Sequence, residues 1–130
     1  DVTYRIGDVA AAISSGSFLT RGMAVVPCTI KTAGALAVSF TDNLLTRAAD
    51  VTLKERRRLV LVVRETPLHL GHLRVLSQLA EFGATIMPPM PAFYQRPATI
   101  DDIIDQTVGR ILDQFGIDPP RELFRRWGET

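Results

Sequence analysis

The strongest constraint on the fold is residues 59–63, five apolar residues (LVLVV) followed at once by Arg64 and Glu65. A short, unbroken apolar run is typical of a strand buried on both faces, as in a parallel sheet. The carboxyl ends of such strands are where α/β proteins bind their ligands. We therefore expect Arg64 and Glu65 to lie at a functional site.

The composition predicts one globular domain over residues 1–130. The chain is 46% hydrophobic and 22% charged, which suits a folded core of this length. The longest apolar run is far too short to cross a membrane, and no basic region followed by an apolar one opens the chain. We expect neither membrane insertion nor secretion.

The charge argues against a nucleic-acid partner. The net charge is +1 at pH 7, and the basic stretch 54–58 is most simply a solvated helix end. The lone Cys28 excludes an internal disulfide and suits a reducing compartment, so we expect a cytoplasmic protein.

Segments with strand and helix patterns alternate along the chain, which predicts an α/β fold with a parallel sheet. Proline and glycine mark most of the boundaries. Helices are expected at residues 8–13 with Asp8 as N-cap, 33–39, after an Asp42 cap, 72–81, 99–114 and, as a short basic amphipathic helix, 119–127; strands are expected at 22–27, 59–63 and 84–87.

A series of sequence blocks is distributed along the chain: SSGSF (14–18), PCTIKT (27–32), DNLLTRAADV (42–51) with KERR (54–57), RETPLHLGHLR (64–74), MPPMPAFY (87–94) and DQF (113–115). In the same order, these blocks resemble those of the UbiX-type flavin prenyltransferases, formerly described as aromatic-acid decarboxylases. The resemblance covers nearly the whole chain.

This resemblance implies a three-layer Rossmann-like, or flavodoxin-like, fold with a mainly parallel sheet. Family members begin with a further strand and a glycine-rich loop that holds the flavin phosphate. We find no such loop before the first predicted helix, so residues 1–130 are expected to be an N-terminally incomplete flavoprotein-type domain.

The implied activity joins a dimethylallyl group from dimethylallyl phosphate to N5 and C6 of reduced FMN. The product would be the prenylated-FMN cofactor of a partner UbiD-type decarboxylase, and no metal is required. Family members form homo-oligomers with sites at subunit junctions. The tail, with Phe124 and Trp127, offers apolar surface for such contacts.

The resemblance also assigns site residues. Glu65 would be the catalytic carboxylate and a proton carrier, with Lys54 as the second catalytic group. Cationic and phenolic donors suit a phosphate because each supplies a strong hydrogen bond. The phosphate ligands would be Arg47, Lys54, Tyr94 and Arg110, and the FMN contacts would be Thr29, Ile30, Lys31, Thr32 and Arg64.

Taken singly, the cations have simpler interpretations. Arg47 could pair with Asp50, Arg110 could pair with Asp113, and Lys54 could be ordinary surface.

Other polar residues carry weaker signals. His69 and His72 are three residues apart, but no carboxylate or thiol completes a metal set, so a packing role between strand and helix is favoured. Cys28 has no local His-Asp partner and is read as a small buried residue. Ser14, Ser15 and Ser17 most simply form a turn, although the resemblance places this loop near the flavin.

Three other functions stay open. The related flavin-dependent cysteine decarboxylases share the fold, but their Pro-Ala-Ser-Ala-Asn-Thr block is replaced by residues 27–32, and their Pro, Met, Asn and Trp clamp is missing. Direct decarboxylation of aromatic acids lacks an evident acid-binding pocket. The last is a non-catalytic fragment that binds or stores flavin.

Overall fold

The computed structural model describes residues 1–128 and divides the chain into two compact units. The first unit is Asp1–Pro88, and the second begins at Pro89. We describe each unit by itself. The single domain expected over residues 1–130 stays a prediction.

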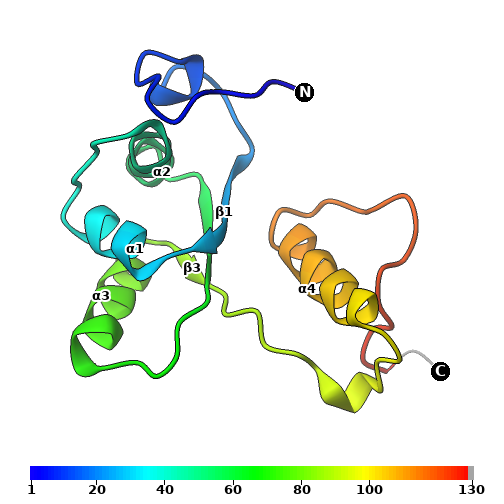
Figure 1. The fold of residues 1–130 in the computed structure, drawn as a ribbon. Coiled ribbons are helices and arrows are strands. Elements are labelled where there is room, and N and C mark those ends of the chain that lie inside the picture. Colours follow the sequence, from blue (N-terminus) through cyan, green and yellow to red (C-terminus); the bar gives the residue numbers. More distant parts are fainter. Residues whose placement is uncertain (129–130) are drawn as a thin grey trace. The chain divides into compact units, whose positions relative to one another are not determined.

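A three-stranded parallel sheet forms the centre of the first unit (Figure 1). Its strands are β1 (Gly22–Cys28), β2 (Arg58–Val63) and β3 (Thr85–Ile86), in the order β1-β2-β3. Every residue of β2 after Arg58 is buried, which the apolar run predicted, because this central strand is covered on both faces. The expected parallel sheet of an α/β fold is confirmed.

Three helices pack around this sheet, α1 (Ile30–Ala37), α2 (Leu44–Lys54) and α3 (Leu70–Glu81). Both α1 and α2 lie between β1 and β2 in sequence, and α3 leads from β2 to β3. Small residues let α1 pack closely: Ala33 is fully buried and contacts the same core as Leu36 and Leu79.

Two predictions at the N-terminal side are wrong in detail. Instead of a helix at residues 8–13, a single 3₁₀ turn, η1 (Ala12–Ser14), is formed, and Asp8 caps nothing. The N-cap of α2 is Asn43 rather than Asp42, since Asn43 forms a reciprocal capping box with Thr46.

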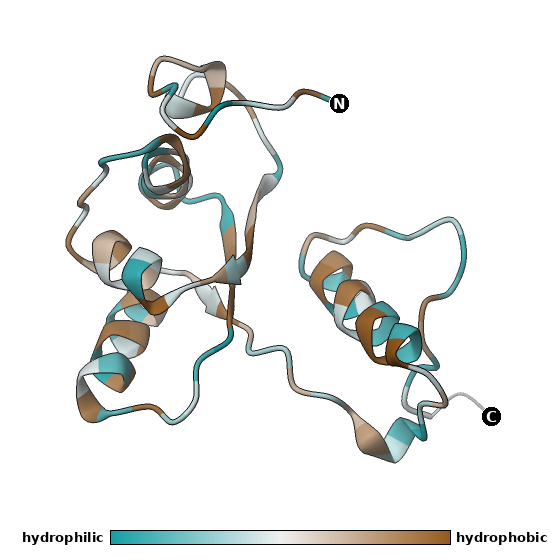
Figure 2. Cartoon of the chain, in the orientation of Figure 1, coloured by the Kyte–Doolittle hydropathy of each residue, from teal (hydrophilic) through white to brown (hydrophobic). Residues whose placement is uncertain are grey.

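The second unit contains the 3₁₀ turn η2 (Phe93–Gln95) and the long helix α4 (Ile100–Gln114). Thr99 and Asp102 form the predicted capping box, and Gly116 ends the helix region with a φ of +61°. Apolar and polar residues alternate in bands along α4 (Figure 2), as expected of an amphipathic helix.

The predicted helix at residues 119–127 is absent, and these residues form irregular structure. Long-range contacts hold this segment to α4. The Phe124 ring lies over Gly109, where an added Cβ would stand 2.5 Å from it, and Arg121 pairs with Asp105 at 3.0 Å. Tertiary contacts therefore decide the conformation here, against the local amphipathic pattern.

None of the helices formed by residues 1–128 combines the length and the hydropathy of a membrane-spanning segment.

Candidate flavin and phosphate site

The predicted FMN-binding residues meet at the carboxyl edge of the sheet. Cys28 at the end of β1 pairs in register with Val63 at the end of β2. Thr29 and Arg64 therefore follow two neighbouring strands at the same edge, which is where ligands of open α/β sheets bind. The structure brings together the two chain segments that the sequence assigned to the flavin.

The N-terminus of α1 suits an anionic or polar flavin group. Thr29 is the N-cap, and its hydroxyl accepts a hydrogen bond from the Thr32 amide at 3.1 Å. The hydroxyls of Thr29 and Thr32 also lie 3.1 Å apart, and Lys31 is exposed. Amide groups of the first helical turn, aided by the helix dipole, favour an acceptor or anion at this place.

Arg64 and Glu65 are exposed directly after β2. Within the described chain, neither side chain makes a hydrogen bond or ion pair with another residue, so both are available to a ligand. The placement of the two charges agrees with the position expected from the apolar run before them.

Two of the predicted phosphate ligands lie on α2, seven residues apart. The Arg47 Nε donates to the carbonyl oxygen of Ser14 at 3.1 Å, rather than pairing with Asp50. The Lys54 Nζ lies 2.6 Å from Glu55 Oε1, and this hydrogen bond lowers the pKa of the Glu55 carboxyl. Both cations are thus oriented by contacts within the first unit.

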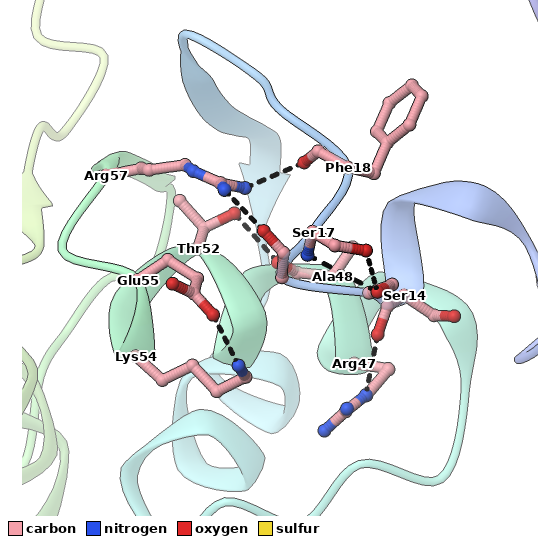
Figure 3. A network of polar contacts seen from close by, with 11 residues as sticks. Ser14, Ser17, Phe18, Arg47, Ala48, Thr52, Lys54, Glu55 and Arg57 are labelled. Carbon is pink, nitrogen blue, oxygen red and sulfur yellow. Dashed lines mark hydrogen bonds and ion pairs between the residues drawn. The ribbon is translucent and has the colours of Figure 1, made fainter.

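The loop at residues 14–18 is bound to α2 and to the turn after it (Figure 3). Arg57 donates to the carbonyl oxygens of Gly16 and Phe18, and the same loop carries the Ser14 carbonyl that Arg47 contacts. A hydrogen bond of 2.9 Å joins the hydroxyls of Ser15 and Ser17. The loop is therefore an ordered part of the surface next to Lys54.

The other two predicted phosphate ligands belong to the second unit. Arg110 pairs with Asp113 at 2.7 Å, the interpretation that its spacing alone suggested. Asp113 also binds Arg126 at 2.8 Å, and the Arg126 and Arg110 hydrogen bonds hold the pKa of its carboxyl below the ordinary value. Tyr94 in η2 is exposed and meets Trp127 edge to face, with ring centroids 5.7 Å apart.

Comparisons with known proteins show the family to which the chain belongs. The Flavoprotein family model matches residues 5–112. Flavin prenyltransferase UbiX of Escherichia coli (strain K12) is 65% identical over 127 residues, which cover 98% of this chain and 67% of that protein. The chain belongs to the UbiX flavin prenyltransferase family. The resemblance stated from sequence is confirmed.

Solved structures of UbiX proteins share the fold. AnUbiX (PadA1), crystallised with FMN and dimethylallyl pyrophosphate, has 53% identity and a TM-score of 0.93 over 98% of this chain and 66% of its own. The dodecameric FMN-dependent Ubix-like decarboxylase of Escherichia coli O157:H7 has 51% identity and a TM-score of 0.90 over 93% of this chain and 66% of its own. The flavodoxin-like α/β fold is confirmed, and the chain spans about two thirds of the length of these UbiX relatives.

The remaining candidates have structural roles in this UbiX-family chain. His69 is the N-cap of α3, where its Nδ1 accepts from the His72 amide at 3.1 Å, and the two rings stack. Residues 1–128 hold no group of three His, Cys, Asp or Glu side chains arranged for a metal ion. Cys28 is buried, and desolvation raises its pKa to about 11, which agrees with a packing role.

Sequence reasoning missed that Arg57 binds the loop at residues 14–18. The basic stretch 54–58 reads as a solvated helix end, yet Arg57 binds carbonyl groups 39 and 41 residues earlier in the chain. A carbonyl acceptor leaves no mark in the side-chain pattern. The only available signal was the glycine at position 16, and it also fits an ordinary turn.

Proposed function

We propose that the protein containing this chain is a flavin prenyltransferase. It joins a dimethylallyl group from dimethylallyl phosphate to N5 and C6 of reduced FMN, and it requires no metal. The observation that carries the proposal is the meeting of Thr29–Thr32 with Arg64 and Glu65 at one sheet edge, since these are the residues assigned to FMN and to proton transfer.

The residues at the sheet edge bind and orient the cofactor. When bound, reduced FMN supplies the two ring atoms that take up the dimethylallyl group. The Thr29 and Thr32 hydroxyls, the first amides of α1 and the Lys31 ammonium offer donors to it. The Arg64 guanidinium adds a fixed positive charge beside the same edge.

The phosphate ligands stabilise the leaving group. Breaking the carbon–oxygen bond of dimethylallyl phosphate leaves an allylic cation and releases a phosphate anion. Donors already in place lower the energy of that anion without reorganising in the transition state. We assign this role to Arg47 and Lys54 on α2, Tyr94 in η2 and Arg110 on α4.

Glu65 is proposed to carry the proton. Alkylation at C6 releases a proton from the ring carbon, and a carboxylate beside the flavin can accept it or relay it to the departing phosphate. The exposed position of Glu65 after β2 leaves its carboxylate free to reach a ligand.

The deciding experiment mixes the full-length protein with reduced FMN and a dimethylallyl donor under anaerobic conditions. We expect the mass of the flavin to rise by one dimethylallyl unit. Because AnUbiX was crystallised with dimethylallyl pyrophosphate, the monophosphate and the pyrophosphate should be compared as donors. A flavin that binds but keeps its mass with both donors would contradict the proposal.

A second candidate is FMN-dependent decarboxylation, because one close structural relative carries that description. Phenolic and aromatic acids incubated with the FMN-loaded protein would then release carbon dioxide without a second enzyme. The expected result is no release until a decarboxylase that uses the prenylated flavin is added.

Three further expectations belong to the same proposal. The product would pass to a UbiD-type decarboxylase. The protein would form a homo-oligomer, as the Ubix-like decarboxylase described as dodecameric does, and its sites would lie at subunit junctions. The cytoplasmic location stays a prediction.

A further inference from the structure

Arg57 holds the loop at residues 14–18 through main-chain atoms. Its Nη2 donates to the Gly16 carbonyl at 2.6 Å, and its Nη1 donates to the Phe18 carbonyl at 2.9 Å. Two bonds from one planar guanidinium fix both the distance and the direction of the loop. Figure 3 shows these two bonds together with the third contact, from Arg47 to Ser14.

The loop held in this way lies against the Lys54–Glu55 ion pair. A Cβ atom added at Gly16 would collide with the Glu55 carboxylate and would stand 2.9 Å from the Lys54 Nζ. Gly16 does not have a positive φ, so its glycine matters for the space it leaves to the ends of the Glu55 and Lys54 side chains and not for backbone conformation. The main chain at Gly16 therefore packs beside the Lys54 ammonium and limits the directions in which it can point.

The packing of the Gly16 main chain beside Lys54 restricts the motion of the lysine side chain. Its side chain is 48% exposed, and a long, flexible ammonium side chain loses considerable entropy when it is ordered. A phosphate binds more tightly to a cation that is already held in place, because the ordering cost does not fall on the binding step.

We propose that Arg57 is a positioning residue for the phosphate site, acting through Gly16 to fix the direction of the Lys54 ammonium. The inference rests on the proposed function, in which Lys54 binds the phosphate of the prenyl donor. Arg57 itself touches no substrate. Its Nη1 and Nη2 both donate to loop carbonyls, and Glu55 supplies the second contact that orients Lys54.

The neighbouring sequence offers matched variants. Arg57→Ala removes both bonds, whereas Arg57→Lys keeps the charge but cannot hold two carbonyls as a fork. Gly16→Ala adds a methyl group that displaces the ends of the Glu55 and Lys54 side chains without changing any charge. Arg58→Ala is the control, since Arg58 carries the same charge one residue later and has an exposed side chain at the start of β2.

The experiment measures the affinity of the full-length, FMN-loaded protein for inorganic phosphate and for dimethylallyl phosphate by calorimetry. Arg57→Ala and Gly16→Ala are each expected to lower the affinity for both anions by about tenfold. Arg57→Lys should recover only part of the loss, and Arg58→Ala should change neither affinity. FMN affinity should be unchanged in all four, and hydrogen exchange at residues 14–18 should rise in Arg57→Ala.

A double-mutant cycle with Lys54→Ala separates positioning from general damage. If Arg57 acts through Lys54, then Arg57→Ala causes no further loss in the Lys54→Ala background. A further loss of similar size there, or a normal affinity in Gly16→Ala, would overturn the inference.

The same measurements distinguish a failure of the proposed function from a failure of the role assigned to Arg57. If Lys54→Ala binds phosphate normally, the assigned phosphate set is wrong and the role of Arg57 falls with it. If Lys54→Ala binds weakly while Arg57→Ala binds normally, only the role of Arg57 is overturned.

Discussion

At the scale of single residues, Glu65 allows the proposed catalytic role to be tested separately from ligand binding. Its exposed carboxylate comes shortly after the end of β2 and makes no hydrogen bond or ion pair with another side chain within residues 1–128. A group in that position can be changed without loosening the core of the first unit. This makes its role accessible to substitution.

We predict that Glu65→Gln lowers kcat for flavin prenylation by about a hundredfold or more, the usual contribution of a general acid or base. The amide keeps the shape of the side chain but cannot take up the proton, so FMN affinity should stay normal. Glu81→Gln, which changes another exposed carboxylate, at the end of α3, is the control. Unchanged turnover in Glu65→Gln would remove the assigned role.

Cys28 precedes the segment that we propose binds FMN, yet burial makes its thiol unreactive. Its side chain is 1% exposed, and desolvation raises its pKa to about 11. At a pH about three units below that value, roughly one thiol in a thousand is ionised, and only the thiolate reacts quickly.

We therefore predict that iodoacetamide leaves Cys28 unmodified in the native protein at mildly alkaline pH and modifies it fully in denaturant, as read by peptide mass. Labelling should rise as the pH approaches the pKa. Rapid native labelling at lower pH would mean that the end of β1 opens to solvent.

At the scale of elements, the beginning of α4 shows how local chemistry defines a helix. The Thr99 hydroxyl accepts from the Asp102 amide at 3.1 Å, while the Asp102 carboxylate accepts from the amides of Ala98 and Thr99. These backbone hydrogen bonds lower the pKa of Asp102, and the bond from Ala98 has the largest effect. The box satisfies amides that the helix itself leaves without partners.

Thr99→Ala should cost about 1 kcal/mol of stability, the usual effect of losing an N-cap. Thr107→Ala removes the same atoms from the middle of α4 and should be neutral or slightly stabilising, because alanine favours helix. Hydrogen exchange at the first turn of α4, with chemical denaturation, measures both. Equal effects of the two substitutions would contradict the capping role.

Asp113 joins α4 to the segment that follows it. Arg126 and Arg110 both donate to its carboxylate, and these bonds depress its pKa in the folded state. A carboxyl with a depressed folded pKa contributes stability above its unfolded pKa. That contribution is lost as the pH falls through the folded value.

We expect the melting temperature of the protein to fall on the acid side of about pH 4, the ordinary range of aspartate. Asp113→Asn should be less stable at neutral pH and less sensitive to acid in this range. Asp118→Asn, an exposed aspartate on the following loop, is the matched control. An unchanged acid response in Asp113→Asn would show that the carboxylate contributes no such stability.

Some of these elements were predictable from sequence, and the reason is local. The strands follow apolar runs, and α4 lies between a capping box and Gly116, so nearby residues define each. At residues 8–13 short local turns replace the expected helix, as in the hydrogen bond from the Ala11 amide to the Asp8 carbonyl oxygen. The tail at 119–127 was mispredicted because its contacts are distant in sequence. In the tail, Phe124 against Gly109 and Arg126 with Asp113 outweigh an amphipathic pattern.

The candidate site divides in the same way. The sheet edge with Arg64 could be placed from the end of an apolar run, and the individual ligands came from family blocks. The loop at residues 14–18 could not be placed beside Lys54, because only the folded chain brings the Arg57 guanidinium to its carbonyls.

At the scale of the whole molecule, large apolar side chains are exposed in both units. Leu19 is 84% exposed and Val38 74% exposed in the first unit, and Trp127 is 86% exposed in the second. Large apolar side chains left in water favour association.

We predict that the full-length protein sediments as a homo-oligomer and that Leu19→Asp shifts it toward smaller species, because burying the new charge is costly. Ser77→Asp places the same charge on an exposed position of α3 and should leave the sedimentation unchanged. A monomer in the wild-type protein would contradict the assembly.

The way in which Arg57 binds its loop has an evolutionary consequence. An arginine that recognises carbonyl oxygens is indifferent to the side chains beside them, so positions 17 and 18 can drift among natural variants without loosening the attachment. Positions 16 and 57 lack this freedom. We expect lineages that lose the arginine at 57 to lose the glycine at 16 as well. The glycine leaves room for the Lys54 side chain only while the arginine holds the loop beside it.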